Sequence, residues 1–169
     1  MDQLNQFRKE KDEFFARHSQ SPLTHEQKHA FQGLLYYPEN PAFKIEATIE
    51  RFPEIKNVIM QTSTGDLQSY QRYGRFQFDV GGQTAELTIY ESDHEYFLPF
   101  VDTLAEKETY GAGRYLEPIS LGKGKFLIDF NYAYNPYCAY NERWSCPIPP
   151  AENRLKVAIP AGEKIFKAH

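Results

Sequence analysis

The residues best suited to chemistry gather between positions 108 and 154 of this 169-residue chain. This stretch holds both cysteines and the only tryptophan, among many Asn, Tyr, Asp, Glu and Arg side chains. Polar groups cost free energy when they are buried, and binding pockets typically place a few of them among rigid apolar and aromatic side chains. The composition therefore predicts a polar, aromatic-lined pocket. It indicates where the protein acts, but not on which molecule.

An arginine follows a glycine-rich turn at the start of this stretch. Glu108 and Tyr110 precede the tripeptide Gly-Ala-Gly, and Arg114 then opens a predicted strand. The glycines permit a tight turn or a close approach of the backbone to a ligand, and a guanidinium offers a planar fork of donors to a carboxylate or phosphate. We therefore predict that Arg114 anchors an anionic ligand. An internal ion pair with Asp129 or Glu108 is the competing interpretation.

The predicted strand at 125–134 has two faces of different character. One face is apolar and aromatic, whereas Asp129, Asn131 and Asn135 lie on the other. In a closed or strongly curled sheet this polar face would line an interior cavity, as it does in barrels that hold ligands. A simply hydrated face is the alternative.

Cys138 and Cys146 are the only thiols, and we predict that both are reduced and serve as ordinary, partly buried residues. A disulfide closing the short loop between them is a weaker alternative. A Cys138 nucleophile is weaker still, because no histidine lies near it in the sequence. The spacing is not that of a zinc motif, so no metal and no cofactor is predicted.

We expect the function to be binding of a small polar or anionic molecule. Arg114 would anchor the ligand, Tyr110 and Tyr140 would orient it, and Asp129 with Asn131 would supply selective hydrogen bonds. The predicted ligand-binding residues are Glu108, Tyr110, Arg114, Asp129, Asn131, Asn135, Cys138, Tyr140 and Asn153.

Two other functions fit the same residues. A hydrolase or acid–base enzyme would use Glu108 or Asp129 as its base, and Asp102 or Glu152 as a further carboxylate, if two of these groups met in a desolvated cavity. A structural protein would instead use the polar residues to join its loops to its sheet, as satisfied buried networks do. The sequence does not decide whether the protein is an enzyme.

Size and charge restrict the class of protein. The chain suits one domain, 1–169, and has no apolar run long enough to span a membrane. Its 19 Lys and Arg against 23 Asp and Glu give a net charge of −4 without a basic cluster, so nucleic acid is not an expected partner. The charged N-terminus lacks the apolar core of a secretion signal, which favours a cytoplasmic location. The oligomeric state is not indicated.

Helices are predicted only near the N-terminus. Residues 3–17 show a broken helical stripe of apolar side chains, which favours a helix docked on the surface. Ser21 followed by Pro22 offers one helix start, and Thr24 with Gln27 matches a capping box; either predicts a short helix ending near Gly33. The predicted domain thus begins with helices in residues 1–33, packed on a β region at 43–160.

From position 43 the apolar residues alternate, as in half-buried antiparallel strands. Gly81-Gly82 predicts a two-residue hairpin, because both positions tolerate positive φ. We therefore predict a mainly β protein, with one antiparallel, curled or barrel-like sheet behind short N-terminal α-helices. The predicted strands are 45–49, 57–62, 76–80, 84–90, 96–100, 114–120, 125–132 and 155–159.

Several sequence blocks resemble a widespread, largely bacterial family known only as a domain of unknown function. The blocks are KDEFF and SPL near the start, FxGLxYYP at 31–38, FLPFVD at 97–102, ETYGAGRYLE at 108–117, DFNYAYNPYCAY at 129–140 and CPIPPAENRL at 146–155. The similarity covers almost the entire chain, and the last three blocks together are highly specific. The resemblance implies family membership and a single domain. It implies no activity.

Overall fold

The computed structural model describes residues 2–166, and an α-helix opens the chain. Helix α1 (Gln3–Arg17) begins at Asp2, whose carboxylate accepts a hydrogen bond from the Asn5 amide at 2.8 Å. Such a cap satisfies one of the amide groups that have no partner within the helix. The predicted helix at residues 3–17 is confirmed.

Helix α2 (His25–Ala30) begins with the predicted capping box. The Gln27 amide donates to Thr24 Oγ1 at 3.1 Å, and the Thr24 amide donates to Gln27 Oε1 at 2.8 Å. The helix ends at Ala30 and does not reach Gly33 as predicted, because Phe31 is already extended, with ψ at 127°. The sequence therefore predicted the start of α2 more accurately than its end.

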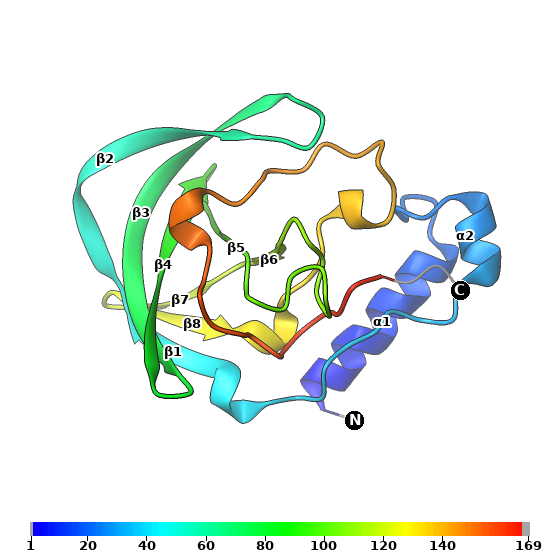
Figure 1. Cartoon of the computed structure of the whole chain (residues 1–169), viewed down its shortest axis with the longest axis horizontal. Helices are drawn as coiled ribbons and strands as arrows, with labels where there is room; N and C mark the ends of the chain where they lie inside the picture. The colour runs from blue at the N-terminus through cyan, green and yellow to red at the C-terminus, as the bar shows by residue number, and fades with distance from the viewer. Residues whose placement is uncertain (1, 167–169) are drawn as a thin grey trace.

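The described residues contain eight strands in two antiparallel sheets. A three-stranded sheet has the order β1-β8-β7, and a five-stranded sheet has the order β2-β3-β4-β5-β6. The mainly β class with N-terminal helices is confirmed, although the strands form two curled sheets rather than one (Figure 1). The strands are β1 (Lys44–Thr48), β2 (Glu50–Gln61), β3 (Leu67–Val80), β4 (Gln83–Ser92), β5 (Glu95–Phe100), β6 (Arg114–Leu116), β7 (Ile119–Gly122) and β8 (Lys125–Asp129).

Two tight hairpins shape the larger sheet. Gly81 and Gly82, with φ of 55° and 82°, join β3 to β4, so the predicted glycine hairpin is confirmed. Asp93 and His94, with φ of 50° and 66°, join β4 to β5. Positive φ at both central residues matches the twist of the flanking strands. The second hairpin was not predicted, since Asp and His signal this conformation less strongly than glycine.

The long strand β3 bends at Gly74, where its pairing with β4 shifts register. A Cβ atom at this position would lie 2.6 Å from Ile49 Cγ2 and 2.7 Å from the Glu50 carbonyl oxygen. Only glycine therefore allows this close approach of the chains. Irregularities of this kind increase the local twist of a sheet, and β2, β3 and β4 are strongly curved in Figure 1.

The predicted strands 57–62 and 76–80 are too short, because β2 and β3 begin at Glu50 and Leu67. Three other predicted strands are broken, end early or are irregular. The predicted strand 114–120 is divided into β6 and β7 by a break that contains Pro118, which has no N–H for a ladder. The predicted strand 125–132 ends at Asp129, whose carboxylate accepts a hydrogen bond from the amide two residues later and starts a 3-10 turn. The predicted strand 155–159 is irregular, although the Leu155 amide still donates to the Val101 carbonyl at 2.7 Å. The 3-10 helices are η1 (Pro41–Phe43), η2 (Phe130–Tyr132), η3 (Tyr137–Ala139) and η4 (Ala151–Asn153).

The main core lies between the two sheets. Leu87 of β4 and Ile128 of β8 are fully buried there, and the rings of Phe78 and Phe130 pack with centroids 5.5 Å apart. Burial of such large apolar surfaces is the dominant favourable contribution to folding. It holds the sheets together and fixes the ends of their strands.

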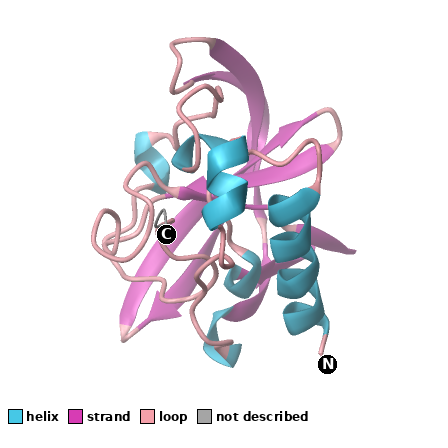
Figure 2. Ribbon diagram, turned by 90° about the vertical axis from the view of Figure 1, so that its right-hand side faces the viewer, coloured by secondary structure: helices cyan, strands magenta, loops and turns pink. Residues whose placement is uncertain are grey.

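A smaller core attaches the helices. Phe15 of α1 packs on Tyr140 with ring centroids 5.0 Å apart, and Leu23 and Leu34 complete the cluster. The two α-helices pack on loops and irregular segments, on one side of the molecule (Figure 2). None of the helices in residues 2–166 has the length and apolar character needed to cross a membrane.

Candidate functional site

Arg114 lies inside the protein, with only 1% of its surface exposed. Its guanidinium donates hydrogen bonds to three carbonyl oxygens of the 159–163 segment. The Asp102 carboxylate lies 3.5 Å from Nη2. The predicted internal partners, Asp129 and Glu108, are therefore wrong. Burial lowers the pKa of Arg114, and the negative charge of Asp102 opposes that effect.

Glu163 is the second centre of this buried polar network, which we define as Asp102, Arg114, Asn135, Tyr140, Glu163 and the main chain of residues 159–164. Its carboxylate accepts hydrogen bonds from Lys11 Nζ and the Tyr140 hydroxyl, each at 2.6 Å, and from the Asn135 amide at 3.3 Å. Burial raises the pKa of Tyr140, and the charge of Glu163 adds to that shift. Sequence reasoning missed Glu163, because its segment carries no recognisable motif.

Two further predicted residues serve the same C-terminal segment. Asn135 Nδ2 donates to the Lys164 carbonyl at 3.0 Å. The Glu108 carboxylate accepts from the Tyr37 hydroxyl at 2.9 Å, and its carbonyl accepts from the Ile165 amide at 2.8 Å. These contacts connect distant parts of the chain within the protein.

Asn153 is fully buried and joins two neighbouring strands. Its Oδ1 accepts from the Thr88 amide at 2.9 Å, while Nδ2 donates to the carbonyl oxygens of Thr88 and Pro99 at 2.9 and 2.8 Å. The Asn153 side-chain amide thus satisfies main-chain groups that would otherwise need a hydrogen-bond partner from another strand. Asn153 is not among the residues that line the two pockets described below.

Asn131 acts in a similar way on the segment before β1. It exchanges two hydrogen bonds with the main chain of Asn40, with distances of 2.8 and 3.0 Å. Asp129 accepts hydrogen bonds from both the amide and the side chain of Asn131. Because β8 ends at Asp129, the continuous polar strand face predicted at 125–134 does not exist, and Asn131 and Asn135 lie beyond the strand.

The remaining predicted residues meet at the two cysteines. The Tyr110 hydroxyl lies 3.6 Å from Cys138 Sγ, and the Cys138 amide donates to Cys146 Sγ at 3.2 Å. Both cysteines are free thiols in the structure. The nine predicted ligand-binding residues are therefore spread over several separate hydrogen-bonded groups. Other side chains line the pocket that we consider the candidate site.

That pocket opens where β3 and β4 separate. The two strands pair as far as Gln71 and Glu91, after which β4 turns into β5 and β3 continues beside β2. A cavity of about 410 Å³ lies between these elements, β6 and the Pro147 segment. We call it the tyrosine pocket. Its lining includes the aromatic residues Tyr70, Phe97, Tyr115 and Tyr134 and the carboxylates Asp93, Glu95 and Glu117.

The aromatic rings form a continuous series. Tyr70 stacks on Phe97 with centroids 5.3 Å apart, Phe97 meets Tyr115 edge-on at 4.8 Å, and Tyr115 meets Tyr134 edge-on at 5.9 Å. The main chains of Tyr115 and Tyr134 also exchange hydrogen bonds of 2.8 and 2.9 Å. Segments far apart in sequence thus provide one rigid aromatic wall.

Carboxylates surround this wall. Burial raises the pKa of Glu117, and the nearby charge of Glu95 raises it further, whereas the hydrogen bond from the Tyr134 hydroxyl and the charge of Lys11 lower it. The Glu117 side chain nevertheless remains exposed to solvent, which moderates these effects. The described residues that line the pocket include no lysine or arginine.

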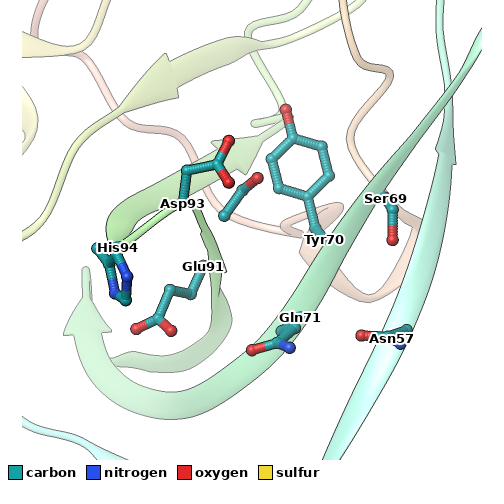
Figure 3. A pocket seen from close by; sticks show the side chains of 8 residues that line it. Asn57, Ser69, Tyr70, Gln71, Glu91, Asp93 and His94 are labelled. Carbon is teal, nitrogen blue, oxygen red and sulfur yellow. The ribbon is translucent and has the colours of Figure 1, made fainter.

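A second cavity of about 330 Å³ adjoins the first, and we call it the hairpin pocket (Figure 3). It lies between β3 and the Asp93-His94 turn, with Asn57 of β2 at one side. Tyr70 and Asp93 line both pockets. Polar groups dominate here, so the two cavities together present a polar part and an aromatic part.

The tyrosine pocket lies partly in the stretch where the sequence predicted a pocket. Tyr115, Glu117, Tyr134 and Pro147 lie between positions 108 and 154, where an aromatic-lined pocket was predicted. None of the predicted ligand-binding residues is among those lining either pocket. The alternation of side chains along a strand could have indicated that Tyr115 and Glu117 lie on the same face of the sheet. No local signal in the sequence indicates that Tyr70 lies near them.

The chain matches a protein family over most of its length. A family model described as "Protein of unknown function (DUF1684)" matches residues 29–164, and no curated protein matches the chain. Among solved structures, an uncharacterized protein from Haloarcula marismortui, studied by solution NMR, is 34% identical, and the match covers 96% of this chain and 92% of that chain with a TM-score of 0.73. The predicted resemblance to a domain of unknown function is thus confirmed, and the chain belongs to the DUF1684 family.

Proposed function

We propose that the protein binds a small organic cation in the tyrosine pocket. One observation carries the proposal: the rings of Tyr70, Phe97 and Tyr115 and the carboxylates of Glu95 and Glu117 line one cavity of about 410 Å³. Cavities of roughly 300 to 1,000 Å³ commonly hold small molecules. Aromatic faces attract cations, and carboxylates accept hydrogen bonds from an ammonium group.

The charges in this pocket favour a cation over the anion expected from the sequence. That expectation rested on Arg114, whose donors are directed to the protein's own carbonyl groups. In the pocket, burial raises the pKa of Glu117, and the negative charge of Glu95 adds a smaller shift in the same direction. A bound ammonium group would relieve this repulsion. Lys11 already lowers the pKa of Glu117, but its ammonium group is bound by Glu163 at 2.6 Å and is not among the residues that line the pocket.

A matched set of probes tests the charge preference. 2-Phenylethylamine, 2-phenylethanol and 3-phenylpropanoate share a ring and a short chain but are cationic, neutral and anionic. We expect the amine to bind most tightly in NMR titrations, with amide shifts centred on Tyr70, Phe97 and Tyr115. Preferential binding of the carboxylate, or shifts centred elsewhere, would refute the proposal.

Two substitutions test whether residues of the tyrosine pocket contribute to the affinity for the amine. Glu117→Gln and Tyr70→Ala should each weaken amine binding by about two- to fivefold, as expected for an exposed charge contact or an exposed cation–π contact. Glu86→Gln is the matched control, since Glu86 is an exposed carboxylate of β4 outside both pockets. Equal affinities for all three variants and the wild type would contradict a role for the pocket.

An acid–base enzyme is the second candidate, because a carboxyl group with a raised pKa lies in this pocket beside another carboxylate. Glu117 would then serve as the acid in hydrolysis or proton transfer. The test is a hydrolysis screen with amine-bearing esters and glycosides at pH 5 to 8. Turnover that Glu117→Gln abolishes and Glu86→Gln leaves unchanged would support the enzyme, and binding without turnover would support the binding function.

We also propose the setting in which this binding takes place. The chain would act as one domain in the cytoplasm, with a small molecule rather than nucleic acid or a membrane as its partner. The net charge of −4 without a basic cluster supports this proposal. Gel-shift titration with a mixed-sequence DNA and RNA should therefore show no binding at physiological salt.

A further inference from the structure

The two cysteines lie side by side although eight positions separate them. Cys138 belongs to the 3-10 helix η3 and is half-buried, whereas only 7% of the Cys146 surface is exposed. The Cys138 amide donates to Cys146 Sγ at 3.2 Å, so the Cys146 sulfur lies against the main chain of Cys138. One sulfur is therefore open to small reagents, and a second, more protected sulfur lies next to it.

The surroundings hold the two sulfurs in different ways. The main chain at Cys146 is fixed to β2 and its turn, because the Ser63 amide donates to the Cys146 carbonyl at 3.0 Å and the Cys146 amide donates to Ser63 Oγ at 3.2 Å. The Tyr110 hydroxyl lies 3.6 Å from Cys138 Sγ. These contacts orient a donor towards Cys138 and restrict the movement of Cys146.

Hydrogen bonding separates the acidities of the two thiols. The influence of the Cys146 side chain lowers the pKa of Cys138 to about 6, and Tyr110 and Ser63 act in the same direction against the effect of burial. The Cys138 side chain in turn raises the pKa of Cys146. Tyr110, whose own pKa is raised by burial, stays protonated and able to donate. The nearby charges also include Glu142, which acts on Tyr110.

We propose that Cys138 and Cys146 form a dithiol site that reduces low-molecular-weight disulfides, with Cys138 as the attacking sulfur and Cys146 as the resolving sulfur. The exposure of one thiol and the protection of its neighbour match this division of roles. The site is independent of the proposed function, since neither cysteine lines the tyrosine pocket.

The reaction has two displacement steps. The Cys138 thiolate attacks one sulfur of a disulfide R–S–S–R, the S–S bond breaks, and the leaving RS⁻ takes a proton from solvent. Cys146 then loses its proton and attacks the Cys138 sulfur of the mixed disulfide, which releases a second RSH. The protein dithiol is oxidised to a disulfide by two electrons, and the small disulfide is reduced to two thiols.

A structural metal site fits these residues less well. Within residues 2–166, no cluster of three or more His, Cys, Asp and Glu side chains could hold a metal ion, so the pair gains no further ligand. Zinc sites in proteins use three or four protein ligands. Two neighbouring thiols with a tyrosine donor are instead suited to thiol–disulfide exchange.

Glutathione disulfide is the probe for the first test. The reduced full-length protein is incubated with it, quenched in acid, and analysed by intact mass after alkylation of the remaining thiols. We expect wild-type protein to lose two hydrogens and both alkylation sites, without a lasting glutathione adduct. Cys146→Ser should accumulate one glutathione on Cys138, whereas Cys138→Ser should remain unmodified over the same time.

Equal modification of the two serine variants, or a wild-type protein that keeps both thiols, would overturn the proposal. Each variant is first checked by thermal unfolding. If Cys146→Ser does not fold, wild-type protein is instead mixed with a substoichiometric amount of glutathione disulfide and quenched rapidly. Peptide mapping should then find the first mixed disulfide at Cys138, and a first adduct at Cys146 would contradict the assigned roles.

The pH dependence of alkylation provides the second test. In wild-type protein, iodoacetamide should label Cys138 with a half-maximal rate near pH 6, well below the value of about 8.5 for an ordinary thiol. Tyr110→Phe removes one donor and should move this midpoint to higher pH, whereas Tyr73→Phe, a half-buried tyrosine away from the cysteines, should not. A midpoint near 8.5 in wild-type protein would exclude an activated Cys138.

Discussion

The buried polar network and the tyrosine pocket contain similar side chains but use them in opposite ways. In the network, Arg114 and Glu163 are each 1% exposed, and their polar atoms bind groups of the protein itself. In the pocket, Glu95 and Glu117 remain exposed to solvent. A buried charge requires internal partners, whereas an exposed one keeps water that a ligand can displace. Polar residues that cluster in a sequence therefore mark a scaffold as readily as they mark a site.

This comparison predicts that substitutions in the network act on stability and that substitutions in the pocket act on binding. The largest effect is expected at Arg114. Arg114→Met should lower the free energy of unfolding by about 3 to 5 kcal/mol, because it leaves Asp102 buried without its cation. Arg114→Lys should cost less, since it keeps the charge but loses the fork of donors.

Urea unfolding followed by circular dichroism measures these changes, and Arg75→Met is the matched control. Arg75 pairs with Glu50 at 3.2 Å, but its side chain is 43% exposed. Its replacement should leave the urea midpoint close to that of the wild type, because exposed ion pairs contribute little to stability. Similar losses at the two arginines would remove the distinction between the network and the surface.

Asn153→Ala should have the next largest effect. The substitution leaves the Thr88 amide and the carbonyl oxygens of Thr88 and Pro99 without these partners inside the protein, at a cost of about 1 to 3 kcal/mol. The control is Asn57→Ala, because Asn57 is exposed in the hairpin pocket. Thermal unfolding of both variants would show a small loss for Asn153→Ala if the amide were not structural.

Glu117 should make the stability depend on pH with a defined sign. Its pKa is raised above the ordinary value of 4.5, so the folded protein binds the Glu117 proton more tightly than the unfolded chain. The stability that this proton contributes is fully present below the unfolded pKa and is lost as pH rises through the folded pKa. Glu117→Gln should therefore gain stability relative to wild type as pH rises from 4 to 7.

Melting temperatures of wild type and Glu117→Gln at several pH values check this sign. Glu86→Gln should show no such trend if the effect arises in the pocket. A difference between Glu117→Gln and wild type that falls as pH rises would mean that Glu117 is stabilised in its charged form. The pocket would then resemble the network in satisfying its own charges.

The smallest effect on stability is expected at Glu95. Glu95→Gln should change the unfolding free energy by no more than about 0.5 kcal/mol, because the side chain is exposed. The same substitution should nevertheless weaken binding of 2-phenylethylamine in an NMR titration. A large loss of stability with unchanged binding would place Glu95 with the scaffold.

Local signals in the sequence were sufficient for much of the fold. Alternating apolar residues predicted the antiparallel strands, Thr24 and Gln27 predicted a capping box, and Gly81-Gly82 predicted a hairpin. Each signal acts through the backbone or side chains of residues only a few positions apart. The same rules failed at Asp129, because one side-chain hydrogen bond ended the strand before its apolar pattern ended.

The candidate site could be predicted only in part. The stretch from 108 to 154 does supply Tyr115, Glu117 and Tyr134 to the tyrosine pocket. Arg114 was predicted to face a ligand, because its sequence neighbours do not show that the 159–163 segment surrounds it. Whether a polar side chain is a ligand donor or a structural one depends on what lies opposite it.

The sequence by itself determined the class of fold, the hairpin at Gly81-Gly82 and the membership of a family. Tertiary structure alone decided that Tyr70 of β3 stacks on Phe97 of β5, that Glu163 joins the buried polar network, and that Cys138 lies beside Cys146. The physical reason is range. Backbone conformation and strand alternation depend on near neighbours, whereas these contacts depend on sheet order, strand curvature and the path of loops, which the packing of the whole core sets.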